Sequence, residues 1–323
     1  MPPYLYFENE TPIQQATQMT SQREKGKKIK GRKGLIAPDF EQIETNPVLT
    51  QRVITYLEKR AENPDKPFFL YMPMPAPHKP WVPAPQFKGK SQAGDYGDFT
   101  YQTDFHIGQV DAALKRLGLA ENTILVITSD NGAHWRPHEI EKYQHKANGN
   151  WRGMKASIYE GGHRVPFIVR WPGKVQANSV SDTNISLVDL MATVAAINSI
   201  ALPVNAAEDS HNILPALLGQ ETPIREATVY HAVAGMFAIQ KGDWKLVHGK
   251  GSGGFASLAD RKLKKTNPKK LRELRAKLPP VQLYDLAKDP GETTNLHKQH
   301  PEIVKELKGL LMQYKSQGYS RPK

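Results

Sequence analysis

The sequence predicts an α/β fold, in which a mostly parallel sheet is sandwiched by helices and a small C-terminal subdomain adds an antiparallel sheet and a closing helix. Twice before residue 133, a stretch with helical spacing of its apolar residues leads into a short apolar run, and this alternation is typical of a parallel sheet covered on both faces. After about residue 220, short β-rich runs are separated by glycine-containing turns, which indicates an antiparallel meander. With 323 residues, of which 39% are apolar, the chain is long enough to bury such a core.

The first helix-and-strand pair is expected between residues 46 and 74. Apolar residues from Leu49 to Leu57 recur at helical spacing, and Pro47 suits the first turn of a helix. The helix is expected to lead into "PFFLYMPM", residues 67–74, as a short buried strand.

The second pair repeats this arrangement and continues into a third strand. Residues 101–119 show helical spacing, and residues 122–132, "NTILVITSDNG", are a strand rich in β-branched residues. A long polar loop from His134 to Glu160 follows, and residues 164–175 then form a third strand closed by a Pro-Gly turn. Another covering helix is expected over residues 186–197.

The C-terminal part is predicted to consist mainly of short strands followed by a helix. Residues 227–249 contain three short β-rich runs, residues 281–286 form one more strand, and residues 300–317 form a terminal amphipathic helix. Residues 261–277 are expected to form a solvated basic helix. The sequence thus divides into an irregular leader (1–34), a partial α/β core (35–222) and a C-terminal subdomain (223–323).

The formal net charge of +12 is concentrated in two short segments. Residues 261–277 carry nine Lys/Arg and one Glu, and residues 23–33 carry seven and one, so the remainder of the chain is slightly acidic. A basic field over the whole surface is therefore excluded, and a nucleic-acid partner is not expected. Residues 261–277 contain no aromatic side chain to stack on bases, which favours a solvated helix face over nucleic-acid binding.

The sequence also restricts redox and metal chemistry. It contains no cysteine, which excludes disulfides, thiolate metal sites and a cysteine nucleophile. The first twenty residues lack a basic segment followed by an apolar core, and no apolar run approaches the roughly 20 residues that a membrane span needs. These residues therefore predict neither an export signal nor a membrane span in the chain as written.

Asp130 and Asn131 are the candidate metal ligands. They are adjacent oxygen donors where the second strand ends, and ligands of open α/β sheets collect at such ends. A carboxylate beside a neutral amide suits a hard divalent cation, Ca²⁺ or Mg²⁺. Because calcium usually takes six to eight oxygens, further ligands must come from elsewhere. The alternative is an Asx turn or a helix cap, for which "DNG" is equally suited.

His78 and Lys155 are the candidate catalytic and substrate-binding residues. His78 lies between prolines after the first strand, and Lys155 lies in the loop before the third. A lysine can hold a non-bridging oxygen of an anion, and a histidine can donate a proton to the leaving oxygen of an ester. Prolines restrict the backbone around His78. The alternatives are a solvated lysine and a histidine hydrogen-bonded within a proline-rich surface loop.

His134 is a further candidate for substrate contact. It shares a polar loop with His138 and His145, whose spacing matches no zinc pattern, so the loop is expected to face substrate or solvent. In "EGGHRVP", close backbone packing of the glycines is favoured over phosphate binding, because no P-loop or G-x-G-x-x-G spacing accompanies them. Arg164 is expected to pair with Glu160.

Taken together, several stretches resemble the sulfatase family, the arylsulfatase-like branch of the alkaline phosphatase superfamily. They occur in the family's order over about residues 35–310: "PAPHKPW", "LVITSDNG", "WRGMKASIYEGGHRVPFIVRWPG", "SLVDLMATV" and "QLYDLAKDPGETTNL". The resemblance implies an alkaline phosphatase-like fold without its N-terminal part, and a sulfuric ester hydrolase. It also implies that Asp130 and Asn131 bind Ca²⁺, with Mg²⁺ less suited, that Lys155 contacts the sulfate, and that His78 protonates the ester oxygen.

The sequence departs from the family's pattern in one respect. Sulfatases carry paired aspartates and a C-x-P-x-R or S-x-P-x-R element whose Cys or Ser becomes formylglycine, and neither element occurs here. The resemblance therefore places formylglycine in an N-terminal part that this sequence lacks, and we expect the chain to be inactive alone. The implied substrates are sulfated small molecules or carbohydrates, and the implied compartment is the periplasm or the outside of the cell.

Two other functions remain open at this level. A phosphatase or phosphodiesterase of the same superfamily would hold two zinc ions with several Asp and His ligands, whereas Asp130 and Asn131 favour one calcium. A non-catalytic protein that binds polyanions through residues 261–277 is the third possibility.

Overall fold

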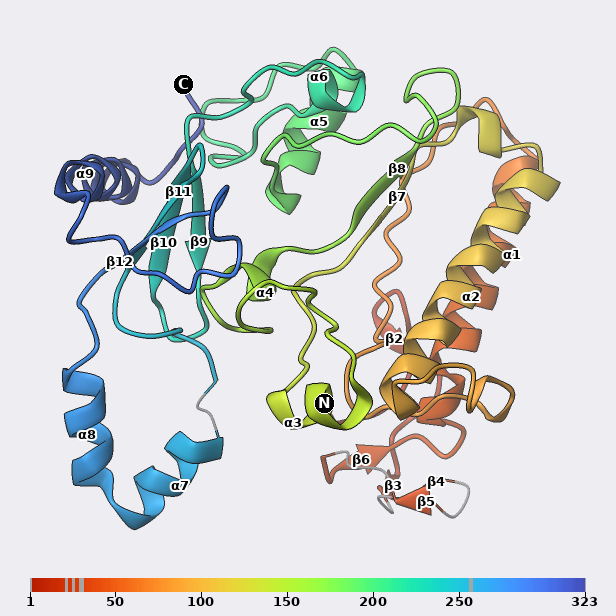
Figure 1. Ribbon diagram of the computed structural model, residues 1–323. Coiled ribbons are helices and arrows are strands. Elements are labelled where there is room, and N and C mark those ends of the chain that lie inside the picture. The colour runs from red at the N-terminus through yellow and green to blue at the C-terminus, as the bar shows by residue number, and fades with distance from the viewer. Residues whose placement is uncertain (1, 21–22, 25–26, 29–31, 256–257, 323) are drawn as a thin grey trace. The chain divides into compact units, whose positions relative to one another are not determined.

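The structure is a computed structural model that describes residues 2–20, 23–24, 27–28, 32–255 and 258–322 (Figure 1). The chain forms two compact units, Met1–Thr123 and Ile124–Lys323. Of the helices that these residues form, none combines the length and the apolarity that a membrane crossing requires.

The first unit is built around two long helices. Helix α1 (Thr45–Ala61) packs on α2 (Gly94–Arg116) through a cluster that includes Leu57 and Leu114. Both helices occur where helices were predicted, but α2 begins at Gly94, before the predicted range of 101–119. The remaining elements of this unit are two-residue strands and 3-10 turns: β1 (Phe7–Glu8), β2 (Thr11–Pro12), β3 (Gln18–Met19), β4 (Arg23–Glu24), β5 (Lys27–Lys28), β6 (Leu35–Ile36), η1 (Gln42–Glu44), η2 (Pro85–Phe87) and η3 (Ala120–Asn122). Part of the basic stretch 23–33 lies outside the described residues.

The buried strand predicted over residues 67–74 is wrong. Burial alternates along the segment as it does in a strand, with Phe68 and Leu70 half-buried, but Phe69 and Tyr71 are 83% and 77% exposed. Phe68 packs against the α1–α2 cluster. A strand also needs a neighbour for its backbone N–H and C=O groups, and none of the described residues pairs with this segment.

The second unit begins with a two-stranded ribbon. Strand β7 (Leu125–Thr128) and strand β8 (Phe167–Arg170) occur where strands were predicted, but they pair antiparallel, with Val126 opposite Val169. The expected parallel pairing is thus corrected here. In a parallel pair, the connection must carry the chain back to the end of the sheet at which the first strand began. Here residues 129–166 bring the chain back to the end at which β7 finished, so β8 starts opposite Thr128 and runs in the reverse direction. This connection contains two short helices, α3 (Pro137–Tyr143) and α4 (Glu160–His163).

The predicted C-terminal antiparallel sheet and closing helix are confirmed, and with them the mixed α/β fold. The sheet has the order β12-β11-β10-β9 with every pairing antiparallel. Figure 1 shows helix α9 along one side of this sheet and α4 on the other. The sheet strands are β9 (Thr228–His231), β10 (Phe237–Lys241), β11 (Trp244–His248) and β12 (Gln282–Asp285), and the closing helix is α9 (Pro301–Gln317). Between β8 and β9 the chain forms η4 (Leu187–Asp189), α5 (Leu190–Ile197) and α6 (Leu214–Leu217).

The two faces of this sheet bury different partners. Ile239 and Leu246 pack against α9, while their neighbours Ala238 and Val247 pack against Ile158 of the long loop. This follows from the alternation of side chains along a strand. The sheet therefore supports, on one face, the loop that carries Lys155.

The basic segment forms two helices rather than one. Helix α7 (Leu258–Thr266) and helix α8 (Pro268–Ala276) are separated at Asn267, whose side chain accepts a hydrogen bond from the Lys270 N–H and caps α8. Proline at the first position of a helix and asparagine at its N-cap explain why the single predicted helix breaks here.

Candidate functional site

Asp130 and Asn131 lie in the turn that follows β7. Asp130 is exposed and Asn131 is half-buried. The side-chain amide of Asn131 donates to the Gly132 carbonyl (3.1 Å), and the Ser129 hydroxyl donates to the Asn131 carbonyl (3.2 Å). Because the amide N–H₂ of Asn131 is used in this bond, its Oδ1 is the atom suited to act as a ligand beside the Asp130 carboxylate.

The turn is held against the "EGG" segment by backbone contact. The Gly132 N–H donates to the Gly162 carbonyl (3.1 Å), and a Cβ placed on Gly132 would meet the Gly161 carbonyl oxygen at 2.0 Å. Glycine is therefore required at residue 132 by close approach. The glycines of "EGGHRVP" serve backbone packing, as the sequence indicated.

We expect Gly132→Ala to lower the free energy of unfolding of the unit Ile124–Lys323 by about 1–3 kcal/mol, because an added methyl group must displace backbone atoms. Urea unfolding followed by circular dichroism measures the change. Gly309→Ala is the matched control, since nothing lies within 4 Å of its Cβ position in α9. The control should gain roughly 0.5–1 kcal/mol because alanine favours a helix interior, and a loss of the same size in both variants would contradict the close-packing argument.

The loop that carries Lys155 is tied to the same turn. The Lys155 N–H donates to the Ala133 carbonyl (3.3 Å), two residues after Asn131. Asn148 binds Ala133 from a third segment, accepting from its N–H at 2.7 Å and donating to its carbonyl at 3.0 Å. Ala156, next to Lys155, has a φ of +78°, a left-handed conformation that non-glycine residues adopt at a cost and that is often found at functional sites. The structure therefore brings Asp130, Asn131 and Lys155 onto connected backbone.

Lys155 lines a cavity of about 200 Å³, formed by residues between Arg152 and Tyr159 and by Ser252, Gly254 and Phe255. The two cations at its wall differ in what they contact. The Arg152 guanidinium donates to the Glu292 carbonyl (2.7 Å) and lies over the Tyr159 ring at 4.0 Å. Among the described residues, the half-buried Lys155 ammonium has no hydrogen-bond or ion-pair partner. It is thus the cation available to an anionic ligand in this cavity.

His134 lies beside one wall of this cavity. Its ring is 5.7 Å from the ring of Phe255, a lining residue, and its Nε2 accepts a hydrogen bond from Arg136 Nε at 3.3 Å. The ring of His145 lies 6.2 Å from the ring of Trp135, whose indole N–H donates to the His145 carbonyl at 2.8 Å. Within the described ranges, no three His, Asp or Glu side chains are grouped as metal ligands.

His78 belongs to the other unit, Met1–Thr123. It is exposed, and its Nδ1–H donates to the Lys79 carbonyl at 2.6 Å, so Nε2 is the ring nitrogen that faces away from the loop. The loop is braced by Trp81, which donates to the Pro77 carbonyl (3.1 Å) and packs on Tyr96 of α2 (5.3 Å). The exposed Lys79 places its ammonium 3.9 Å from the Trp81 ring. The histidine is therefore held by local contacts on both sides.

Sequence reasoning missed the buried charges behind the Lys155 loop. Lys245 on β11 is fully buried and its Nζ lies 2.8 Å from Glu160 Oε1 and 3.0 Å from Glu292 Oε1. Arg164 also binds Glu160, at 2.8 Å, as expected from the sequence. The signal was present in "WKLVH". Lys245 lies two residues before Val247, so both side chains point to the same, inward-packed face of the strand.

These contacts set the charge states of the network. Burial acts to raise the pKa of Glu160, but Lys245 and Arg164 together hold that pKa below its usual value. Burial raises the pKa of Glu292, and the ion pair with Lys245 and a hydrogen bond from the Glu160 backbone N–H oppose this without reversing it. Burial, together with Lys245, lowers the pKa of His163 to about 4, so this histidine is neutral at pH 7. Lys245 thus holds two carboxylates beneath the loop of the site.

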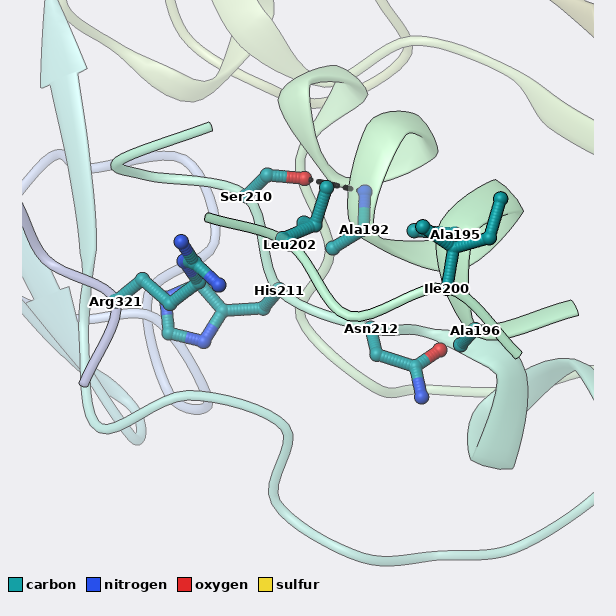
Figure 2. Close-up of a pocket in the computed structure, with 9 residues that line it drawn as sticks. All are labelled: Ala192, Ala195, Ala196, Ile200, Leu202, Ser210, His211, Asn212 and Arg321. Atoms are coloured by element: carbon teal, nitrogen blue, oxygen red, sulfur yellow. Dashed lines mark hydrogen bonds between the residues drawn. The ribbon is translucent and has the colours of Figure 1, made fainter. Parts of the chain in front are cut away.

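A second cavity, of about 230 Å³, contains none of the sequence-predicted site residues (Figure 2). Alanines of α5, Ile200 and Leu202 form its apolar wall, and His211, Asn212 and Arg321 its polar side. The Arg321 guanidinium donates to the carbonyls of Pro203 and Ala206 at 3.0 and 2.8 Å. The cavity at Lys155 is the better candidate for an anionic substrate, because its lysine has no such partner.

Comparison with known proteins places the chain among the sulfatases. The sulfatase family model matches residues 9–198. An N-acetylgalactosamine-6-O-sulfatase of Bacteroides thetaiotaomicron is 38% identical over 274 residues, covering 83% of this chain and 50% of the relative. Human arylsulfatase A is 33% identical over 260 residues, covering 77% of this chain and 49% of the relative. The chain thus spans about half the length of these curated relatives.

Solved structures show the same relationship. A structure from work on glycosaminoglycan metabolism by Bacteroides thetaiotaomicron matches with a TM-score of 0.73 and 35% identity, covering 88% of this chain and 57% of that one. A sulfatase from Pseudoalteromonas sp. matches in fold, with a TM-score of 0.68 and 21% identity, covering 91% of this chain and 57% of that one. From its fold, its motifs and these matches, the chain belongs to the sulfatase family.

Proposed function

We propose that this chain forms the sulfate-binding part, and a share of the metal site, of an enzyme that hydrolyses sulfate esters of carbohydrates. The observation that carries the proposal is the Lys155 ammonium, which has no partner in the described part of the chain and lines a cavity of about 200 Å³, on a loop bound through Ala133 to the turn of Asp130 and Asn131. An ammonium suits a sulfate oxygen because it is a compact charge that accepts varied geometry. A sulfated carbohydrate is favoured because the relative with 38% identity is named for N-acetylgalactosamine 6-O-sulfate.

Asp130 and Asn131 fit a calcium ion as part of its shell. They offer a carboxylate and an amide oxygen, the donor types that calcium takes, and the amide N–H₂ of Asn131 is already directed to Gly132. Calcium takes six to eight oxygens, so these two residues would hold it together with ligands from outside the described site. When bound, the ion would supply positive charge to the sulfuryl oxygens.

The other residues have separate tasks in this proposal. Lys155 binds a sulfate oxygen and holds the ester in the cavity, and His134 contacts the sugar beside Phe255. In its protonated form, with a proton on each ring nitrogen, His78 donates the Nε2 proton to the departing alcohol oxygen and keeps the Nδ1–H bond to the Lys79 carbonyl. The nucleophile, formylglycine in the family's pattern, would come from sequence beyond these 323 residues, because no C-x-P-x-R or S-x-P-x-R element is present. The proposed compartment is the periplasm or the outside of the cell.

The purified chain should bind inorganic sulfate or a sulfated monosaccharide and show no turnover of an aryl sulfate. Fused behind a family segment that carries C-x-P-x-R, it should hydrolyse sulfate esters, and metal analysis of the active fusion should find one calcium. Hydrolysis of the aryl sulfate by the chain alone would contradict the missing-nucleophile part of the proposal. Two bound zinc ions with phosphate-ester hydrolysis would instead establish the phosphatase alternative.

A further inference from the structure

We propose that α7 and α8 form a docking surface for a sulfated polysaccharide, which places the substrate's further sulfates on these helices while one sulfate enters the Lys155 cavity. The inference rests on the proposed function for the cavity and extends it to the polymer around the reacting sugar. The surface is called here the basic helix pair and consists of residues 258–277.

The charge of the basic helix pair is unbalanced. Its sequence contains nine Lys/Arg against Asp260 and Glu273. Like charges three and four residues apart on a helix repel one another, as for Lys262 and Lys265 on α7 or for Lys269 and Arg272 on α8. An arrangement that opposes its own folding in this way is stabilised when an anion covers it.

The cations of this pair are mostly exposed to solvent. Leu271 is the buried side chain of α8, at 6% exposed. A hydrogen bond from Lys250 Nζ to the Ala276 carbonyl, at 3.2 Å, links α8 to the rest of the unit. Seven cations are exposed and, among the described residues, have no acidic partner: Lys262, Lys264, Lys265, Lys269, Lys270, Arg272 and Lys277.

The pair is continuous with the proposed site. Gly254 and Phe255 line the cavity with Lys155, and α7 begins three residues after Phe255, at Leu258. Three residues of chain span at most about 11 Å. Figure 1 shows α7 and α8 beyond one end of the β9–β12 sheet. A chain of sugars bound by one sulfate at Lys155 could therefore extend over the helices.

The chemistry of the pair favours a sulfated polysaccharide over nucleic acid. Residues 258–277 contain no Phe, Tyr or Trp, so they lack the rings on which unpaired bases stack. Six of the nine cations are lysines, which bind anions as point charges without requiring a fixed geometry. Sulfate groups repeated along a polysaccharide at varied positions suit such a surface.

The test compares two variants of the same charge. The first neutralises the helix pair with Lys264→Gln, Lys265→Gln, Lys269→Gln and Lys270→Gln. The control neutralises four exposed lysines elsewhere in the same unit: Lys174, Lys298, Lys305 and Lys308, each to Gln. Binding of dextran sulfate, unsulfated dextran, duplex DNA and N-acetylgalactosamine 6-sulfate is measured by titration calorimetry at several salt concentrations.

We expect the helix-pair variant to bind dextran sulfate at least about tenfold more weakly than the wild type at 0.1 M salt and with a smaller salt dependence, because fewer cations release counterions. The affinity of the control variant for dextran sulfate should differ from that of the wild type by less than about twofold. N-acetylgalactosamine 6-sulfate should bind both variants equally, and unsulfated dextran should bind none of them. Equal weakening of dextran sulfate in both variants would overturn the inference, as would duplex DNA binding as tightly as dextran sulfate through the same lysines.

The same measurements separate this inference from the proposed function. If the monosaccharide fails to bind the wild type while dextran sulfate still depends on the helix pair, the proposed cavity is wrong and the docking surface stands. If the monosaccharide binds the wild type and the helix-pair variant binds dextran sulfate as tightly as the wild type does, the docking surface is wrong and the proposed cavity is supported.

Discussion

Replacing Lys245 with methionine is expected to lower the free energy of unfolding of the unit Ile124–Lys323 by about 3–5 kcal/mol. Its ammonium is fully buried between Glu160 and Glu292, whose side chains are 4% and 0% exposed. Methionine has a similar shape, so the packing is preserved and the loss comes from two buried carboxylates without a cation. Urea unfolding at pH 7 measures the difference.

Lys241→Met is the matched control for this variant. Lys241 also binds two carboxylates, Glu226 at 3.1 Å and Glu306 at 2.9 Å, but its side chain is 39% exposed. Water replaces exposed ion pairs readily, so this variant should lose less than about 1 kcal/mol. Adding Glu160→Gln and Glu292→Gln to Lys245→Met should restore part of the stability, because the buried charges are then gone. Equal losses at Lys245 and Lys241 would refute the role of burial.

Replacing Lys155 with glutamine is expected to lower kcat of the complete enzyme on a sulfate ester by roughly 10²- to 10³-fold, the usual effect of losing one preorganised charge contact. Glutamine keeps much of the length and polarity but carries no charge to offer a sulfuryl oxygen. Steady-state kinetics on the fusion described above measure this effect, and calorimetry on the chain alone should show weaker sulfate binding.

Lys146→Gln is the control for Lys155→Gln. Lys146 is exposed in the same long loop, and its ammonium lies 3.4 Å from Asn150 Oδ1, outside the cavity lining. The Lys146→Gln variant should keep both kcat and sulfate affinity within about twofold of the wild type, because water screens an exposed charge. A Lys155 variant that retains full activity and full sulfate affinity would remove this residue from the proposed site.

Much of the fold could be read from local patterns. The apolar spacing that predicted the helices at Leu49–Leu57 and over residues 300–317 reports only which side chains share a helical face, and α1 and α9 are found there. The turns within 227–249 likewise indicated β9, β10 and β11. These features depend on residues close in sequence, so neighbouring residues were enough to predict them.

The candidate site was recoverable only in part. Asp130, Asn131 and Lys155 stand out because polar groups follow predicted strands, but the hydrogen bond from Lys155 to Ala133 joins segments whose approach no local pattern reports. Lys245 illustrates the same limit, since a lysine in a strand is usually solvated. Its two carboxylates come from residues 85 and 47 positions away in the chain, Glu160 and Glu292.

The amino-acid sequence by itself determined the helices α1, α2 and α9, the strands of the C-terminal sheet, the concentration of charge in residues 261–277 and the family, because each is written in composition, periodicity or contiguous motifs. Tertiary structure alone decided that β7 and β8 run antiparallel, that Phe69 and Tyr71 remain exposed, and that Lys245 is buried beneath the Lys155 loop. These outcomes depend on contacts between residues that are far apart in the sequence, and such contacts form only when the chain is folded.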